Sequence, residues 1–333
     1  MTWKCLSLYL ALALAGLWAS GCGGDGSTPS TKPNEKPAKG KVVIGVSLLT
    51  LANPFFKEIE RAMREAGAAR GYELIVTAGE LDPAKQKNQV DDFIVNKVSA
   101  IVLCPCDSKS IGTSVQQANK VGIPVFTADI ACLAKDANVV CHIATDNLGG
   151  GRRAAEAILE ATGGTGKVAV IEHPVVESCI LRLKGFTEEI EKANAAGTAK
   201  IQIVGRWPGM GAKDEAFRKA EDILQAHGDL KAIFAANDPM ALGAIAAIEK
   251  AGKSGSIIVV GFDGMPEGKQ AIRDGKIYAD PIQFPDQIGR QTIEAIARHL
   301  AGEELPKEIL IPTRLYRKAD ADKDPTLEKK EHP

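Results

Sequence analysis

This chain of 333 residues is poor in aromatic residues and has almost no excess of charge of either sign. Phe, Trp and Tyr together make up 5% of the sequence, and the formal net charge is −1 at pH 7. Nucleic acids bind mainly through clustered Lys and Arg, so a chain this close to neutrality gives no electrostatic reason to expect a nucleic-acid partner. Because aromatic residues are few, the position of each one is informative.

Catalytic motifs are missing as well. No G-x-G-x-x-G follows a strand pattern, and neither G-x-S-x-G nor H-E-x-x-H occurs, which removes the usual signs of a dinucleotide site, a serine hydrolase and a zinc protease. Residues 163–167 look like a phosphate-binding loop but lack its first Gly and the Ser or Thr after Lys. His142 and His173 fall near strand ends without an evident nucleophile partner. We therefore expect no catalytic residue, no cofactor and no metal ion, and a protein that is not an enzyme.

Long apolar runs are absent except at the N-terminus. Lys4 precedes an apolar stretch over residues 6–17, which is too short for a permanent membrane-spanning helix and is typical of a signal peptide. Small residues then lead to Cys22, and this Ala-Ser-Gly-Cys sequence resembles the lipobox of bacterial lipoproteins, with Ala19 in place of the usual Leu. We predict a lipoprotein signal peptide over residues 1–21 and lipidation at Cys22. The alternative is a plain cleaved signal peptide.

Residues 22–40 are rich in Gly, Ser, Thr, Pro and Lys and contain almost no apolar side chain. A segment of this composition cannot form a hydrophobic core, so we predict that it is a flexible tether. Residues 321–333 are charged and include Pro, which predicts a frayed tail at the other end. We therefore expect an exported folded domain, in the periplasm or on the cell surface, that a lipidated Cys holds at a membrane.

Five cysteines follow the predicted lipidation site: Cys104, Cys106, Cys132, Cys141 and Cys179. In an exported protein, we expect one or two disulfides and a free thiol, although the spacing does not fix the pairing. A metal site that combines the first two with a later Cys or with His142 is the alternative. Cys-x-Cys is not among the common zinc spacings, which disfavours it.

From residue 41 onward, short β-branched runs alternate with helical patterns. The predicted strands are 42–47, 73–77, 100–104, 125–128, 139–143, 168–171, 201–204, 232–235, 257–262 and 279–283. The predicted helices are 54–70, 83–96, 108–121, 148–161, 180–193, 214–226, 239–251 and one that starts at Pro285. Alternation of this kind indicates an α/β fold with parallel sheets covered on both faces, and so many strands predict two doubly wound lobes.

An internal repeat supports the two lobes. Residues 99–129 parallel residues 231–263, and each copy ends an apolar strand with an acid, Asp129 in the first and Asp263 in the second. Because open α/β sheets bind ligands at the carboxyl ends of their strands, the two acids would face one another across a cleft. A helix N-cap or turn role is the alternative for each.

The sequence Asn-Pro-Phe-Phe lies between the first strand and the first helix. Asn53 suits an N-cap, and Pro suits the first helical position. Phe55 and Phe56 point about 100° apart in a first helical turn, so at least one ring should project from the edge of the sheet, unless it packs under a neighbouring loop.

Four more polar residues fall at similar edges. Asn237 and Asp238 follow a strand, and we expect Asp238 to cap the next helix and Asn237 to face the cleft. Arg182, at a helix start, is either a solvated residue or a bidentate donor to a ligand. Gln283 ends the last predicted strand.

Together these residues resemble a known family, the periplasmic sugar-binding proteins of the ribose-binding type, which serve ABC importers. The resemblance covers residues 42–317. The motifs that carry it are Asn53-Pro54-Phe55-Phe56, Asp146-Asn147 with Gly149-Gly150, Phe234-Ala235-Ala236-Asn237-Asp238 with Ala241-Leu242-Gly243, Val260-Gly261-Phe262-Asp263-Gly264, and Gln283-Phe284-Pro285.

The resemblance implies two Rossmann-like lobes, joined by three crossovers, that close by a hinge over a monosaccharide. Residues 41–145 with 284–312 would form the first lobe, and residues 146–283 with 313–320 the second. It also implies the ligand-binding residues: Phe55 and Phe56 against the sugar faces, and Asn53, Asp129, Arg182, Asn237, Asp263 and Gln283 at its hydroxyls.

The sequence departs from the ribose-binding pattern at two positions. Relatives of that type carry an Arg where this chain has Ile130, and an aromatic residue where it has Gly211. Trp207 or Met210 would substitute for that aromatic wall, and Cys179 is a further candidate for the pocket. These departures argue against ribose itself and leave a monosaccharide or sugar-like polyol as the expected ligand.

The expected function is therefore that of a monomeric sugar-binding lipoprotein that delivers its ligand to an ABC permease in the membrane. A receptor that reports sugar occupancy to a sensor kinase or chemoreceptor is one alternative. An exported enzyme or a metal-binding protein that uses the cysteines is another.

Overall fold

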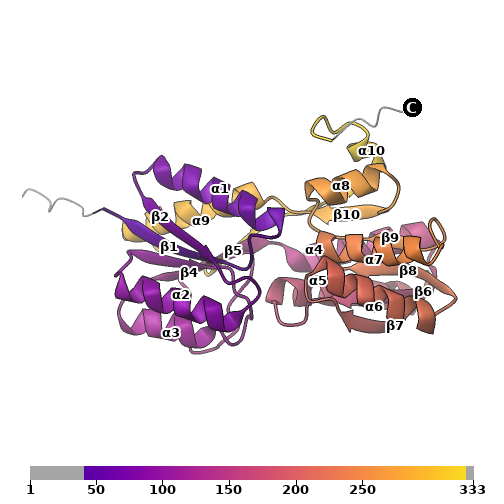
Figure 1. Cartoon of the computed structure of the whole chain (residues 1–333), viewed down its shortest axis with the longest axis horizontal. Helices are drawn as coiled ribbons and strands as arrows, with labels where there is room; N and C mark the ends of the chain where they lie inside the picture. Colours follow the sequence, from indigo (N-terminus) through magenta and orange to yellow (C-terminus); the bar gives the residue numbers. More distant parts are fainter. Residues whose placement is uncertain (1–40, 328–333) are drawn as a thin grey trace, which may run out of the picture. The chain divides into compact units, whose positions relative to one another are not determined.

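The computed structural model describes residues 41–327, which form two α/β lobes, each built on a six-stranded sheet (Figure 1). The predicted signal peptide, the tether and the lipidation site Cys22 lie outside the described residues. Two lobes with mainly parallel sheets are the fold class that the strand–helix alternation predicted.

The first lobe has an all-parallel sheet in the order β11-β5-β4-β3-β1-β2. Its strands are β1 (Val43–Leu48), β2 (Glu73–Ala78), β3 (Ala100–Leu103), β4 (Val125–Ala128), β5 (His142–Thr145) and β11 (Glu308–Ile311). Helices α1 (Pro54–Ala68) and α9 (Pro285–Leu300) pack together on one face, and α2 (Pro83–Val95) and α3 (Gly112–Lys120) on the other (Figure 1).

The second lobe repeats this order as β12-β10-β9-β8-β6-β7, with β12 antiparallel to β10. Its strands are β6 (Thr165–Glu172), β7 (Lys200–Pro208), β8 (Leu230–Ala235), β9 (Ile258–Val260), β10 (Ala279–Ile282) and β12 (Arg314–Arg317). Helices α4 (Asn147–Thr162) and α5 (Glu177–Ala195) cover one face; α6 (Lys213–Ala226), α7 (Asp238–Lys250) and α8 (Pro266–Arg273) cover the other.

The chain passes between the two sheets three times. It leaves the first sheet after β5 to enter α4, returns after β10 into α9, and leaves again between β11 and β12. Strands β3 and β4 hold the same places in the first sheet that β8 and β9 hold in the second. The sequence repeat is therefore a structural repeat, and it puts Asp129 and Asp263 at equivalent strand ends.

The structure adds elements that the sequence patterns did not predict, namely β11, β12, α8 and α10 (Lys318–Ala321). The charged end of the chain also differs from the expected frayed tail, as far as residue 327. Ala321 and Leu327 are buried, and Arg273 Nη1 donates to the carbonyl of Leu327 at 3.3 Å. Among the described helices, none has the length and apolar character needed to cross a membrane.

Candidate functional site

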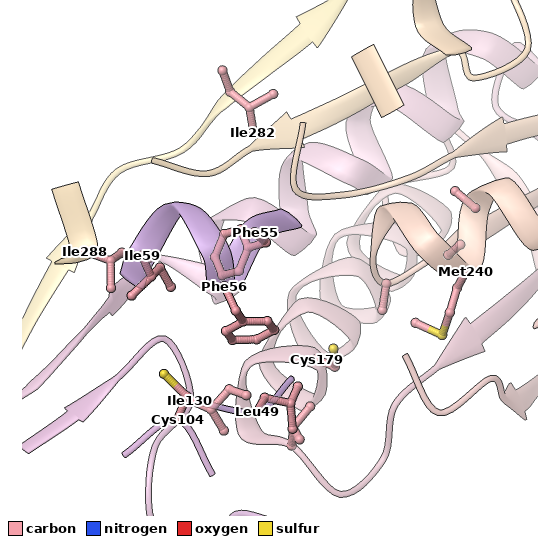
Figure 2. Close-up of a cluster of buried hydrophobic side chains, with 14 of the residues drawn as sticks. Leu49, Phe55, Phe56, Ile59, Cys104, Ile130, Cys179, Met240, Ile282 and Ile288 are labelled. Atoms are coloured by element: carbon pink, nitrogen blue, oxygen red, sulfur yellow. The ribbon is translucent and has the colours of Figure 1, made fainter. Parts of the chain in front are cut away.

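The first turn of α1 presents both phenylalanines to a cavity at the carboxyl edge of the first sheet. Asn53 caps the helix, since its Oδ1 accepts a hydrogen bond from the Phe55 backbone N–H at 2.9 Å. The rings of Phe55 and Phe56 meet edge to face, with centroids 5.2 Å apart, and both line the cavity. Figure 2 shows the two rings at the start of α1, with Leu49 and Ile130 beside Phe56.

The two acids of the repeat adopt the same unusual backbone. Asp129 has φ of 65° and Asp263 has φ of 107°, a region that residues other than Gly rarely occupy. Each backbone N–H donates to the strand that follows in its own sheet, Asp129 to the Ile143 carbonyl and Asp263 to the Pro281 carbonyl. Strain of this kind is typical of functional positions, and here it turns both carboxylates into one cavity.

Arg182, on α5, is buried and fully engaged rather than solvated. Its Nη1 donates to Asp263 Oδ1 at 2.9 Å and to the Ala236 carbonyl at 2.7 Å, and its Nε donates to Asn147 Oδ1 at 2.8 Å. The guanidinium also stacks over the Phe262 ring, 3.8 Å from its centroid. A planar fork with several partners fixes the charge in one place, which Lys would not do.

Two glycines let α5 carry Arg182 this close to α4. A Cβ at Gly151 would lie 1.9 Å from the Arg182 carbonyl oxygen, and a Cβ at Gly185 would lie 2.1 Å from that of Leu148. The helices therefore approach at backbone contact distance, and any larger side chain would displace the arginine.

Burial governs the electrostatics of the site. It raises the pKa of Asp129 to about 7, with Arg182 acting in the opposite direction and the charge of Asp263 adding to the increase. Burial also raises the pKa of Asp263, against the stabilising contacts of Arg182 and Gln283. It lowers the pKa of His173 to about 4, so this imidazole is neutral at pH 7.

The cavity takes its lining from both lobes. The first lobe contributes Leu49, Thr50, Asn53, Phe55, Phe56, Leu81, Asp129 and Ile130; the second contributes His173, Val176, Ser178, Cys179, Arg182, Gly211, Asn237, Asp263 and Gln283. Its volume is about 50 Å³. All eight predicted binding residues, together with Ile130 and Cys179, are in this lining.

Trp207 and Met210 are not part of the lining, so the structure does not support them as a substitute aromatic wall. The Trp207 ring packs against His227 and covers Gly205 on β7, and Met210 is exposed. Gly211, with φ of 72°, borders the cavity instead. A Cβ added at Gly211 would lie 2.9 Å from His173 Nδ1. His173 therefore occupies the side of the cavity where the sequence predicted an aromatic ring.

Asn237 lines the cavity as expected, but the helix cap expected at Asp238 is also supplied by Asn237. Asn237 is the N-cap of α7, because its Oδ1 accepts from the Met240 N–H at 2.9 Å, while its Nδ2 donates to the Gly211 carbonyl at 3.3 Å. Asp238 is 2% exposed and accepts from the Met265 N–H at 2.7 Å. It also lies beside Asp280.

Seven lining residues were not predicted: Leu49, Thr50, Leu81, His173, Val176, Ser178 and Gly211. Gly211 was noted only as a departure from the family pattern, and His173 only as a residue near a strand end. Each of the seven lies within a few residues of the carboxyl end of a strand or of a predicted binding residue, which is the signal that could have found them.

The prediction of disulfides was wrong for the described cysteines, since all five are free. Cys106 Sγ lies against Gly79 and Cys132 Sγ near Gly112, while Cys179 faces the cavity. Burial raises the pKa of Cys106 and of Cys179 to about 12, so these thiols are neutral. Residues 41–327 contain no group of three or more His, Cys, Asp or Glu side chains that could hold a metal ion.

Direct hydrogen bonds join the lobes next to the cavity. Ser108, which follows β3, donates its N–H to the Val175 carbonyl at 3.0 Å and accepts from the Glu177 N–H at its Oγ at 2.9 Å. The Glu177 carboxylate in turn receives the Ala131 N–H of the first lobe, which lowers its pKa, although burial raises that pKa to about 6 overall.

The fold and the site together define a two-lobed ligand-binding protein, with polar and aromatic groups from both lobes around one small cavity. The model of the periplasmic binding protein domain matches residues 44–304. The chain belongs to this family and, within it, to the sugar-binding proteins of the ribose-binding type.

Individual relatives agree with this assignment. The ribose import binding protein RbsB of Bacillus subtilis (strain 168) is 35% identical over 285 residues, 85% of this chain and 90% of that protein. A solved ABC transporter solute-binding protein from Agrobacterium vitis with bound D-fucose has a TM-score of 0.77 at 32% identity, covering 84% of this chain and 97% of that one. Another from Bacillus halodurans C-125, with bound myo-inositol, has a TM-score of 0.79 at 26% identity, covering 86% and 98%.

Proposed function

We propose that this protein is the solute-binding component of an ABC-type importer and holds a monosaccharide or a small polyol between its lobes. The observation that carries the proposal is the shared cavity, with Phe55 and Phe56 from one lobe and Arg182 and Asp263 from the other. Aromatic faces suit the C–H faces of a sugar ring, and buried charged groups suit its rim of hydroxyls.

No bond needs to be made or broken for this function. A ligand that contacts both lobes favours the closed arrangement over an open one, and a hinge at the three crossovers would allow the change. The ligand then shifts the equilibrium by its extra contacts in the closed form. The importer would recognise that form and receive the ligand from it.

The relatives support this choice of ligand class without fixing the sugar. They include a ribose import binding protein and solved proteins with bound D-fucose and with bound myo-inositol. Export, lipid anchoring at Cys22 and a monomeric state belong to the same proposal. Labelling of cells with a radioactive fatty acid, with Cys22→Ala as the control, tests the anchor.

A thermal-shift screen of purified protein against pentoses, hexoses and polyols tests the function itself. A ligand present at 100 times its dissociation constant stabilises the protein by about 2.7 kcal/mol, which a melting curve detects. Calorimetry on each positive compound then gives its affinity. If no sugar or polyol shifts the melting temperature or binds in the calorimeter, the proposal fails.

A further inference from the structure

The charges around the cavity do not balance. Its lining contains two carboxylates, Asp129 and Asp263, and one cation, Arg182. Arg182 is bonded directly to Asp263 and to two uncharged oxygens. His173 adds no charge at pH 7, because burial lowers its pKa to about 4. One carboxylate is therefore left without a cation of its own.

That carboxylate is Asp129. The residue is 3% exposed, and its Oδ1 has no hydrogen-bond partner among residues 41–327. The next residue, Ile130, is apolar and buried. A buried carboxylate without a partner is unfavourable unless it takes up a proton or meets a positive group.

The groups that face Asp129 do not supply that positive group. The charged groups near Asp129 are Arg182, which is already paired with Asp263, and the acids Asp263 and Glu177. The thiols of Cys104 and Cys179 face it too, and burial keeps both neutral by raising their pKa. Two of the three charges near Asp129 therefore have its own sign.

From this imbalance we propose that the ligand is a cationic amino sugar or amino polyol whose ammonium group binds the Asp129 carboxylate. This rests on the proposed function, since it refines the class of solute held by the same cavity. An ammonium group has three donors and no acceptor, so it matches an acid whose oxygen lacks a donor. Hydrogen bonds between ionised partners are about twice as strong as neutral ones.

The rest of the lining agrees with a small cation. The rings of Phe55 and Phe56 border the same cavity, and aromatic faces attract ammonium groups. Lys57 and Lys213 lie in an adjoining groove at the surface, where both are exposed to solvent. Water and salt screen exposed charges over ~8–10 Å, so these lysines do not replace a cation inside the cavity.

Calorimetry with matched pairs tests the proposal: D-glucosamine with D-glucose, D-galactosamine with D-galactose, and D-mannosamine with D-mannose, in phosphate buffer at pH 7. At least one amino member should bind about tenfold more tightly than its neutral partner, the scale of one charge-assisted hydrogen bond. Its affinity should rise as Asp129 loses its proton near pH 7. The affinity should fall again above about pH 8, where an amine of this kind, similar to an α-amino group, loses its charge.

Two variants separate the charge of Asp129 from its shape. Asp129→Asn keeps an acceptor oxygen but removes the charge, so the amino member should lose about tenfold more affinity than the neutral member. Ile130→Arg adds a cation beside Asp129 and should reverse the preference toward neutral sugars, ribose included. Asp222→Asn, at an exposed position on α6, is the matched control and should change neither affinity.

The outcomes are distinct. Neutral sugars that bind as tightly as their amino partners, with Asp129→Asn affecting both equally, would overturn this inference and leave the importer function standing. Binding of neither kind would overturn both.

Discussion

Arg182 Nη1 and Asp263 Oδ1 lie 2.9 Å apart, and both side chains are 3% exposed. Gln283 Nε2 donates to the same Asp263 oxygen at 2.6 Å, and Asn147 accepts from Arg182 Nε. In the second lobe, hydrogen bonds among the polar groups therefore orient these groups before a ligand binds. The first lobe offers Asp129 without such support, so the two halves of the cavity differ in how far they are preorganised.

Replacement of Arg182 by Met should destabilise the protein strongly. The change leaves Asp263 buried without its cation, and breaking a buried pair from one side costs about 3–5 kcal/mol. Urea unfolding followed by circular dichroism measures the free energy of unfolding. Arg153→Met, at an exposed position on the neighbouring helix α4, is the control and should cost less than about 1 kcal/mol. Equal losses in the two variants would contradict a structural role for the pair.

The two aspartates of the repeat should respond differently to Ala. Asp129→Ala and Asp263→Ala each remove an acceptor at the ligand, so each should weaken binding of any ligand by about tenfold or more. Asp263→Ala should also lower stability, because it leaves Arg182 unpaired. Asp129→Ala removes an acid that is already disfavoured by burial, so its free energy of unfolding should stay within about 1 kcal/mol of the wild type. Calorimetry and urea unfolding on the same samples test both statements, and unchanged affinity in both variants would contradict the site.

Much of this arrangement could be predicted from the sequence, because the signals were local. β-branched runs and helical periodicity predicted ten of the strands, and the sequence repeat alone placed Asp129 and Asp263 at equivalent strand ends. Strands β11 and β12 were missed because Pro312 and Thr313 interrupt a short, partly exposed segment. β11 pairs with β5 and β12 pairs with β10, and both partners lie far away in the sequence.

The errors at the site have the same origin. Asn237 and Asp238 are both good N-caps, but Asn237 caps the helix while Asp238 accepts from the N–H of Met265, 27 residues later. Trp207 was a reasonable aromatic candidate, but its direction follows the pairing of β7 with β6. That pairing shifts register between Val168 and Ala169. Local patterns carry no information about such distant partners.

Removal of the Ser108 hydroxyl should weaken binding without changing the order of ligand preference. Ser108→Ala deletes the bond from Glu177 N–H that joins the lobes, and one such hydrogen bond contributes ~0.5–1.5 kcal/mol, or about twofold to tenfold in affinity. The loss should appear mainly as faster dissociation, measured by stopped-flow fluorescence. Ser254→Ala, on an exposed loop of the second lobe, is the control. A changed ranking of sugars would indicate that Ser108 contacts the ligand instead of the opposite lobe.

The pair Asp238–Asp280 should make stability fall as pH rises. Burial raises the pKa of Asp280 to about 7, with the contact to Asp238 opposing the increase and the charge of Asp263 adding to it. Burial also raises the pKa of Asp238 well above its usual range, with the charges of Asp280 and Asp263 adding to the increase. Both acids therefore hold protons in the folded state at pH values where the unfolded chain, with pKa near 3.9, has released them. The folded state binds more protons between about pH 4 and 7, so this contribution to stability is present below that window and lost as pH rises through it.

Asp280→Asn isolates the effect, because the amide keeps the shape of the carboxyl group and removes its titration. We expect the difference in free energy of unfolding between variant and wild type to grow in favour of the variant from about pH 5 to pH 8. The scale is ~1.4 kcal/mol for each unit by which the folded pKa exceeds the unfolded one. Urea unfolding at several pH values measures it, with Asp222→Asn as the exposed control. A pH-independent difference would mean that the pair is ionised in the folded protein, with its charge balanced by the N-termini of α7 and α8.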